Sequence, residues 1–195
     1  MSKWVEQYVQ GCATCQESKI WTHQPKMSLY KIPVPERGLP FWQVAMDLIT
    51  GLPTTRGHNT ILTIVDYRCS RAAIFLPITN MVTGVDIAQL YIDHVYQWFG
   101  LPEKIISDRD PHFTLHFSWE LAKKLVIGQN LSTAFHPQTD NLSEWKNQWI
   151  EQYLWAVTGG WLEQWDKWLA LASAVHNNQM NLTICMSPNE ALIGY

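Results

Sequence analysis

Apolar residues in the first half of the chain gather in short runs separated by turn-forming residues. Three runs are rich in β-branched and aromatic residues, which favour strands: FWQVAMDLIT (41–50), TILTIVDY (60–67) and RAAIFLPI (71–78). The last two follow each other with a short connection, which is typical of a meander. The pattern therefore predicts three consecutive strands in one sheet.

Further along the chain, apolar residues recur at helical spacing. Thr83 is a suitable N-cap for a helix in which Ile87, Leu90 and Val95 share one face, and Gly100 ends it. The remaining predicted elements are a strand at 103–108, a helix at 117–127, a fifth strand at 130–135 and helices at about 139–157 and 161–178. This order predicts an α/β fold with a five-stranded mixed sheet flanked by helices.

The segment before the first strand has a different character. Residues 3–18 show a short helical pattern that Gly11 interrupts, and residues 19–40 contain several prolines without periodicity. Because proline fixes φ and removes a hydrogen-bond donor, the second segment predicts an extended linker. We therefore expect a short N-terminal piece (1–18), a linker (19–40) and a compact domain (41–195).

Composition narrows the class of protein. The chain has 195 residues, of which 47% are hydrophobic, so it can form one domain with a sizeable core. The formal net charge of -3 gives no indication of a nucleic-acid partner. No apolar run reaches the ~18 residues of a membrane helix, so we expect no membrane partner. Lys3, Glu6 and Gln7 interrupt any apolar run at the start of the chain, so we expect no signal peptide. We interpret the four cysteines as reduced thiols of an intracellular protein.

Three acidic residues lie in or next to predicted strands and helices, at positions that a hydrophobic core alone does not explain. Asp47 lies inside an apolar strand, Asp108 lies at the end of another, and Glu144 lies in the first turns of a predicted helix. Each residue alone is explained by capping or by a neighbouring cation such as Arg109. If the strand and helix between Asp108 and Glu144 return the chain to the same sheet edge, the three acids form a set of oxygen ligands for Mg²⁺ or Mn²⁺.

Blocks along nearly the whole chain resemble, in order and spacing, the integrase of gypsy-type LTR retrotransposons and, more distantly, retroviral integrases. These blocks are WVEQYVQGCATCQESK, FWQVAMDLITGLP, TILTIVDY, FGLPEKIISDRDPHFT, LSTAFHPQTDNLSEWKNQ, AVHNNQMNLT and MSPNEALIGY. The resemblance implies a ribonuclease-H-like fold with the catalytic and metal-binding acids at Asp47, Asp108 and Glu144. It also implies two Mg²⁺ or Mn²⁺ ions with the substrate.

The function implied by this resemblance is DNA integration. A polynucleotidyl transferase of this family processes the 3′ ends of element DNA and joins them to target DNA, so we expect DNA as the partner. We also expect a homodimer and a nuclear location, and RNA binding stays open as an alternative.

Several further residues match the motif around Glu144 and are candidates for nucleic-acid binding. They are His136, Gln138, Lys146, Asn147 and Gln148. Asn147 and Gln148 lie three and four residues after Glu144, so they share its helix face and contact DNA or orient the acid. The alternative for these residues is an ordinary solvated loop and helix face. Asp66, in IVDY, is interpreted as structural.

The chain also departs from the family pattern. Asp110 and Asn141 replace glycines, and Trp145 replaces a basic residue after Glu144, which predicts weak DNA binding. Cys12 and Cys15 resemble the second half of a His-His-Cys-Cys zinc site. The two histidines are not present upstream, so we expect a remnant of the zinc-binding domain without zinc.

Two other functions compete with an active integrase. One is a degenerate or co-opted copy that binds nucleic acid or protein without catalysis, and the other is a ribonuclease-H-like nuclease that cleaves without joining.

A separate question concerns Trp161, Trp165 and Trp168, which recur on one face of the last predicted helix. We interpret them as a core stripe, with a dimer interface as the alternative.

Overall fold

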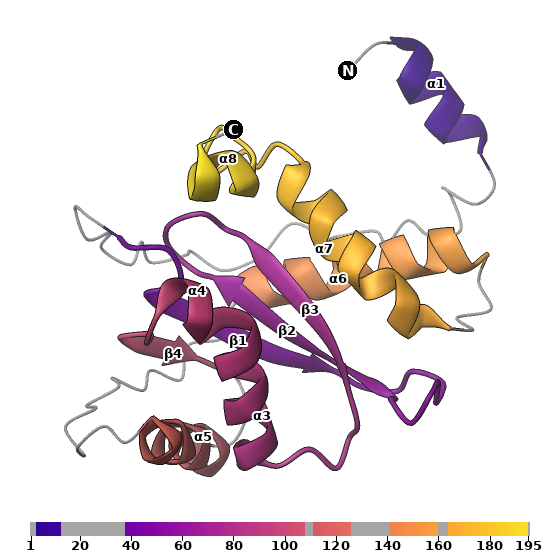
Figure 1. Cartoon of the computed structure of the whole chain (residues 1–195). Helices are drawn as coiled ribbons and strands as arrows, with labels where there is room; N and C mark the ends of the chain where they lie inside the picture. Colours follow the sequence, from indigo (N-terminus) through magenta and orange to yellow (C-terminus); the bar gives the residue numbers. More distant parts are fainter. Residues whose placement is uncertain (1–2, 13–37, 108–110, 126–140, 160–163, 195) are drawn as a thin grey trace.

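The structure, a computed structural model of the chain, describes residues 3–12, 38–107, 111–125, 141–159 and 164–194. Within these residues one sheet lies between two layers of helices (Figure 1). Helices α3 (Gly84–Tyr91) and α5 (Pro111–Lys124) cover one face, and α6 (Asn141–Thr158) and α7 (Leu169–Asn178) cover the other.

The described sheet has four strands in the order β3-β2-β1-β4. The strands are β1 (Gln43–Ile49), β2 (Thr60–Asp66), β3 (Ala73–Ile78) and β4 (Lys104–Ile106). β2 and β3 form the predicted antiparallel meander, β1 adds to it antiparallel to β2, and β4 pairs in parallel with β1. The sheet is therefore mixed, as predicted, whereas the expected fifth strand at 130–135 lies outside the described residues.

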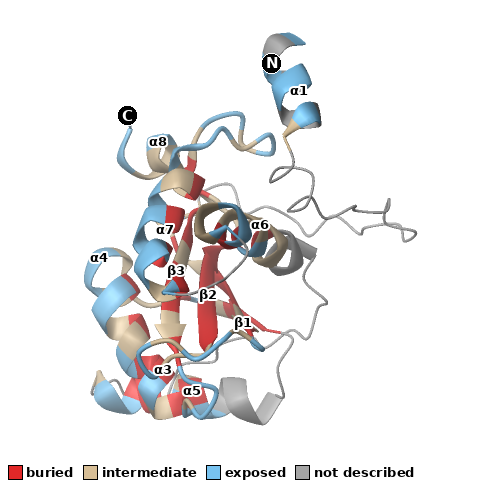
Figure 2. Cartoon of the chain, turned by 90° about the vertical axis from the view of Figure 1, so that its right-hand side faces the viewer, coloured by how far each residue is buried: buried red, intermediate tan, exposed pale blue. Residues whose placement is uncertain are grey.

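The two faces of the sheet explain why the strands are so apolar. Along β1, Val44 and Met46 face the α3–α5 layer, whereas Ala45 and Ile49 face the α6–α7 layer. All seven residues of β2 are buried. Figure 2 shows the same result as a band of buried residues through the strands, with exposed residues on the outer sides of the helices. Burial on both faces is typical of a sheet covered by two helical layers.

The first long helical segment follows its prediction. Thr83 caps α3 in a capping box, in which its side chain accepts from Asp86 N and the Asp86 carboxylate accepts from Thr83 N. The segment continues through η1 (Ile92–Tyr96) and α4 (Gln97–Phe99) and stops at Gly100, whose φ is 80°.

Two other helices differ from the sequence prediction. α5 begins at Pro111 instead of residue 117, because proline is well tolerated in a first helical turn, where its missing N–H has no helical partner to lose. The sequence also did not predict α8 (Pro188–Ile193), which Ser187 caps by accepting from Glu190 N.

The N-terminal pattern does form a helix, α1 (Lys3–Gly11). None of the helices in the described parts is long and apolar enough to cross a membrane.

The tryptophan stripe is only partly core. Trp165, in η2 (Trp165–Trp168), is fully buried with Ile150, Leu154 and Leu169 on the α6–α7 side of the sheet. Trp168 is exposed at the edge of this layer, and Trp161 lies outside the described residues. The core interpretation therefore holds for Trp165 and does not extend to Trp168.

The turn between β2 and β3 is organised by one buried carboxylate. Asp66 is fully buried, and its oxygens accept from the backbone N–H groups of Arg68, Cys69 and Ser70 and from the Ser70 hydroxyl. These bonds satisfy donors that the tight turn would otherwise bury without partners. Asp66 therefore has a structural position, as the sequence interpretation held.

Replacing Asp66→Ala should lower the free energy of unfolding by about 3 kcal/mol or more, because buried N–H groups lose a charged acceptor. Denaturant unfolding of the purified chain measures this change. Asp93→Ala is the matched control, because the Asp93 carboxylate is exposed and accepts from the Gln89 side chain at the surface of the helix. It should change stability by less than about 0.5 kcal/mol. Equal effects of the two substitutions would contradict the structural role of Asp66.

Candidate active site

The candidate site is built around Asp47, the one acidic residue of β1. Its position alternates with Ala45 and Ile49, so its side chain faces the α6–α7 layer and is half-buried there. Asp47 Oδ1 accepts from Leu48 N at 2.7 Å, and Oδ2 accepts from Asn147 Nδ2 at 2.5 Å. The second bond joins a strand and a helix that lie 100 residues apart in the sequence.

Packing of α6 explains why Asn147 reaches Asp47. Ile150 and Leu154 lie three and seven residues after Asn147, so the three residues share one face of α6. Ile150 and Leu154 are fully buried against the sheet, which fixes this face toward β1. The amide oxygen of Asn147 is buried and has no hydrogen-bond partner among the described residues. The sequence predicted that Asn147 contacts DNA or orients the acid, and the observed contact is with the acid.

The other two predicted acids are described only in part. Glu144 lies in α6 one turn before Asn147. Its side chain and the whole of Asp108 lie outside the described residues. β4 pairs with β1 up to Ala45 and Ile106, so the described strand ends two residues before Asp108. The structure therefore brings the helix of Glu144 to Asp47 and leaves the full triad a prediction.

Sequence reasoning missed Thr63 as a member of this site. Thr63 is the residue of β2 that pairs directly with Asp47, so both side chains lie on the same face of the sheet. It is fully buried, and its hydroxyl has no hydrogen-bond partner in the described part of the chain. The signal in the sequence was a hydroxyl residue at the centre of the apolar run TILTIVD.

The described side chains suit a hard cation. Asp47 offers a carboxylate, Asn147 a buried amide oxygen without a partner and Thr63 a buried hydroxyl without a partner. Such oxygen donors are the ligand type that Mg²⁺ and Mn²⁺ prefer. Among the described side chains alone, no group of three His, Cys, Asp or Glu could hold a metal ion, and those of Asp108 and Glu144 are outside that set.

Lys146 differs from its predicted position. Its side chain is only 5% exposed; the ammonium donates to Arg71 O at 3.3 Å and contacts His176 Nε2. Burial, and then the nearby Arg71 guanidinium, lower the pKa of Lys146 from 10.5 to about 8. Burial, and then Lys146, lower the pKa of His176 from 6.5 to about 3. Lys146 therefore faces the protein interior between α6 and α7, where DNA does not reach its ammonium.

The remaining predicted residues are less informative. Gln148 is half-buried on α6, and Cys12 is half-buried just after α1. His136, Gln138, Cys15 and the side chain of Trp145 lie outside the described residues.

Comparison with known proteins gives related sequences and solved folds, although no family model matches the chain. The Tf2-3 and Tf2-4 transposon polyproteins of Schizosaccharomyces pombe (strain 972 / ATCC 24843) are each 34% identical over 193 residues, which is 99% of this chain. The chain spans only 14% of the length of these relatives. It is therefore homologous to one segment of much longer polyproteins.

Three solved structures have the same fold. The catalytic core domain of BIV integrase aligns with a TM-score of 0.57 and 18% identity, over 79% of this chain and 95% of that chain. The HTLV-2 integrase catalytic core domain in complex with magnesium aligns with a TM-score of 0.55 and 18% identity, over 80% of this chain and 99% of that chain. A chain of the simian T-cell lymphotropic virus intasome, in complex with a PP2A regulatory subunit, aligns with a TM-score of 0.62 and 14% identity. This alignment covers 99% of this chain and 67% of that chain. The predicted ribonuclease-H-like fold is thereby confirmed.

Replacing Lys146→Met should raise the free energy of unfolding at pH 7 by about 1–3 kcal/mol, because an apolar side chain fills the site without desolvating a charge. The folded pKa of Lys146 lies below its ordinary value, so between pH 8 and 10.5 the unfolded chain binds more protons than the folded one. The stability of the unmodified protein therefore rises, relative to the variant, through that pH window.

Denaturant unfolding of both proteins across that window measures this difference. The advantage of Lys146→Met should be largest below pH 8 and should shrink toward pH 10.5. Lys123→Met is the control, because the Lys123 side chain is 63% exposed. A Lys146→Met variant whose advantage is the same at pH 7 and pH 10.5 would show that Lys146 is not held in a lowered-pKa position.

Proposed function

We propose that this chain, a member of the integrase superfamily by its relationship to the Tf2 transposon polyproteins and by its fold, is the catalytic core of a gypsy-type LTR retrotransposon integrase. Its reactions are then the processing of the 3′ ends of element DNA and the joining of those ends to target DNA. The hydrogen bond between Asn147 and Asp47 carries the proposal, because it brings the helix of Glu144 against the strand of Asp47.

Asp47, Asp108 and Glu144 are the residues that would hold two Mg²⁺ or Mn²⁺ ions with the substrate. When bound, such ions lower the pKa of an attacking hydroxyl and neutralise charge on the leaving oxygen of a phosphodiester. A carboxylate has about four acceptor positions, so Asp47 can accept from Leu48 and Asn147 and still bind a cation.

The neighbours of Asp47 have supporting roles in this proposal. Asn147 holds one carboxylate oxygen at 2.5 Å and so restricts the rotamer of Asp47 before substrate arrives. Thr63 lies beside Asp47 and offers a hydroxyl from the adjacent strand. His136, Gln138 and Gln148 are proposed to contact DNA, and Lys146 is not, because its ammonium faces the interior.

The rest of the organisation is also proposed. Residues 41–195 form the catalytic core, residues 19–40 the linker, and residues 1–18, with Cys12 and Cys15, part of a zinc-binding domain. The core acts on DNA in the nucleus as a homodimer, and RNA is a further candidate ligand.

Asp47→Asn should abolish metal-dependent joining of a labelled DNA end to a target duplex, because a neutral amide lacks the negative charge and the second oxygen with which the carboxylate would hold the cations. Gel analysis of cut and joined products, with Mg²⁺ or Mn²⁺ present, measures both reactions. Asp93→Asn, an exposed acid on the opposite face of the sheet, should leave them unchanged. Nicking without joining by the unmodified chain would indicate a nuclease. Binding without either reaction would indicate a copy that has lost catalysis.

Asn147→Ala should lower kcat for joining by about 10- to 100-fold, because the carboxylate of Asp47 loses the group that orients it. KM for the DNA end should change little if Asn147 acts through Asp47 and not through DNA. Asn178→Ala is the control, because Asn178 is exposed on α7. A raised KM with unchanged kcat would assign Asn147 to DNA binding instead.

A further inference from the structure

The connection between β1 and β2 is a hairpin that ends in a tight turn. Thr55 and His58 exchange two backbone hydrogen bonds, of 2.8 and 2.9 Å, around Arg56 and Gly57. Arg56 has a φ of 50° and Gly57 a φ of 85°, which is the left-handed pair that a two-residue hairpin turn of type I′ requires. Arg56 therefore stands at the tip of the turn, at a position that asparagine or glycine adopts more easily.

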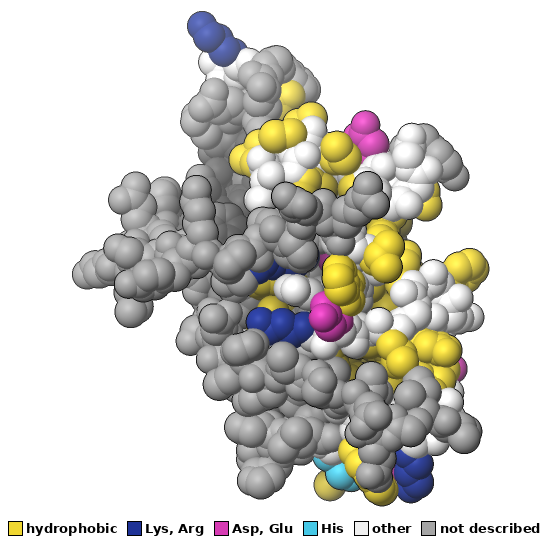
Figure 3. Space-filling model, turned by 90° about the vertical axis from the view of Figure 1, so that its left-hand side faces the viewer, with side chains coloured by type: hydrophobic (Ala, Val, Ile, Leu, Met, Phe, Trp, Pro, Cys, Tyr) yellow, Lys and Arg dark blue, Asp and Glu magenta, His cyan; other side chains and the backbone are white. Residues whose placement is uncertain are grey.

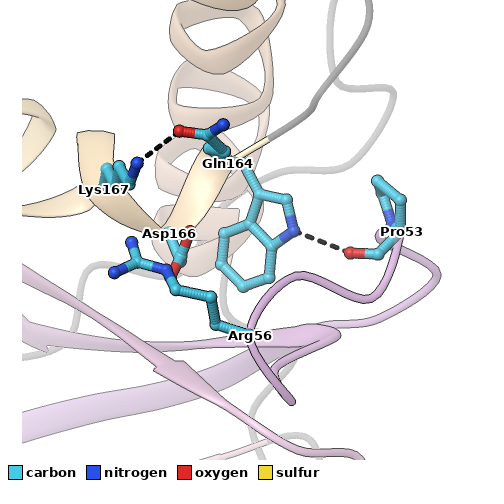
Figure 4. Close-up of polar contacts among 6 residues, drawn as sticks. Pro53, Arg56, Gln164, Asp166 and Lys167 are labelled. Atoms are coloured by element: carbon cyan, nitrogen blue, oxygen red, sulfur yellow. Dashed lines mark hydrogen bonds and ion pairs between the residues drawn. The ribbon is translucent and has the colours of Figure 1, made fainter.

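Two contacts fix this hairpin to η2, and we call them together the hairpin clamp (Pro53, Arg56, Trp165 and Asp166). The buried indole of Trp165 donates through Nε1 to Pro53 O at 2.8 Å. Arg56 Nε pairs with Asp166 Oδ2 at 2.7 Å. Figure 4 shows both contacts side by side between the hairpin and η2. The clamp therefore holds the turn at one place relative to the α6–α7 layer.

The two partners of the ion pair differ in their exposure. The Asp166 side chain is 5% exposed, whereas the Arg56 side chain is 55% exposed. The buried carboxylate thus holds the inner side of the guanidinium, and much of the arginine side chain remains at the surface. Because a guanidinium is planar and has five N–H donors, fixing Nε sets the direction of the others and leaves them available for a second acceptor.

The surroundings of Arg56 favour an anionic acceptor. No acid occurs at positions 50–59, and Asp166, the only acid among the described residues 164–168, is already paired with Arg56; Glu163 lies outside the described residues. Lys167, the residue after Asp166, is exposed. The face shown in Figure 3 also carries described lysines and arginines, one group of them beside an acidic side chain. At the hairpin, the buried Asp166 carboxylate holds the Arg56 guanidinium, and Lys167 follows Asp166 in the sequence.

The hairpin also follows directly from the strand of the candidate site. β1 ends at Ile49, two residues after Asp47, and the hairpin continues beyond that end of the sheet (Figure 1). A DNA duplex bound at Asp47 is longer than the site itself and passes neighbouring surfaces. A phosphate matches the planar fork of a guanidinium well, so the duplex backbone is an acceptor of suitable chemistry.

We propose that Arg56 contacts a phosphate of the DNA bound at Asp47, and that Asp166 is a positioning residue that holds the Arg56 guanidinium for this contact. The inference rests on the proposed function, because it assumes that DNA is the substrate. It adds a nucleic-acid contact outside the predicted motif around Glu144 and gives the hairpin clamp a role in substrate binding.

Salt dependence of binding tests this contact, because each neutralised phosphate contributes about -0.9 to the slope of log affinity against log salt. Binding of a short labelled duplex is measured by fluorescence anisotropy over a series of salt concentrations. Arg56→Gln should make the slope shallower by about 0.9 and weaken binding, whereas Arg56→Lys should keep the slope. Lys123→Gln is the matched control: an exposed cation, paired with Glu120 at 3.7 Å on α5, whose loss should leave the slope unchanged.

A double-mutant cycle tests the role of Asp166. Asp166→Asn should weaken binding several-fold without changing the salt slope, because the charge of Arg56 remains and only its orientation is lost. In an Arg56→Gln background, Asp166→Asn should have no further effect on binding. An equal loss in both backgrounds would mean that Asp166 affects binding by supporting the fold, and the positioning role would be overturned.

A second measurement uses only the unmodified protein, so it does not require that any variant folds. Phenylglyoxal modifies exposed arginines, and mass spectrometry follows the rate at Arg56 in the unmodified protein. Bound duplex should slow this modification rate markedly, and an unchanged rate would overturn the phosphate contact. In the salt titration, a slope of log affinity against log salt that is the same for Arg56→Gln and the unmodified protein would also overturn it. If the protein still joins DNA ends in either case, only this inference fails. If it neither binds nor joins DNA, the proposed function fails as well.

Discussion

A carboxylate in the middle of an apolar strand is the constraint on which the rest of the site depends. Asp47 lies between Ala45 and Ile49 on a sheet face that helices cover, so it needs polar partners there. A backbone N–H from Leu48 and the amide of Asn147 provide them. The second partner is possible only because α6 packs its apolar residues onto the same face, and this packing also fixes the backbone of Glu144 one turn away.

Other buried polar groups on this side of the sheet lower the stability of the fold. Lys146 is buried next to His176, and the pKa values of both groups are lowered because burial disfavours their charged forms. Thr63 and Asn147 each bury a polar atom without a partner among the described residues. Such atoms reduce stability, and these two lie on the strand and the helix that flank Asp47.

The hairpin clamp extends the same principle to the surface. A buried carboxylate at Asp166 and a buried indole at Trp165 hold a connection that would otherwise have few fixed contacts. The clamp ties the end of β1 to the helical layer that covers Asp47. Asp47 and the hairpin are therefore both held from the helical side that includes α6 and η2, although the residues involved come from three separate parts of the sequence.

The sequence by itself indicated the four described strands, the pairing of 60–67 with 71–78, the first long helix and a resemblance to a known family, because these depend on local periodicity and on short motifs. It also singled out Asp47 as a candidate site residue, since an acid inside an apolar run stands out without any neighbours. Only the tertiary structure decided that Asn147 contacts Asp47, that Lys146 faces inward, that Thr63 lies beside Asp47 and that Asp166 pairs with Arg56. These facts depend on the rotation of α6 and on strand register, which are set by packing between segments up to 100 residues apart, and local pattern carries no information about them.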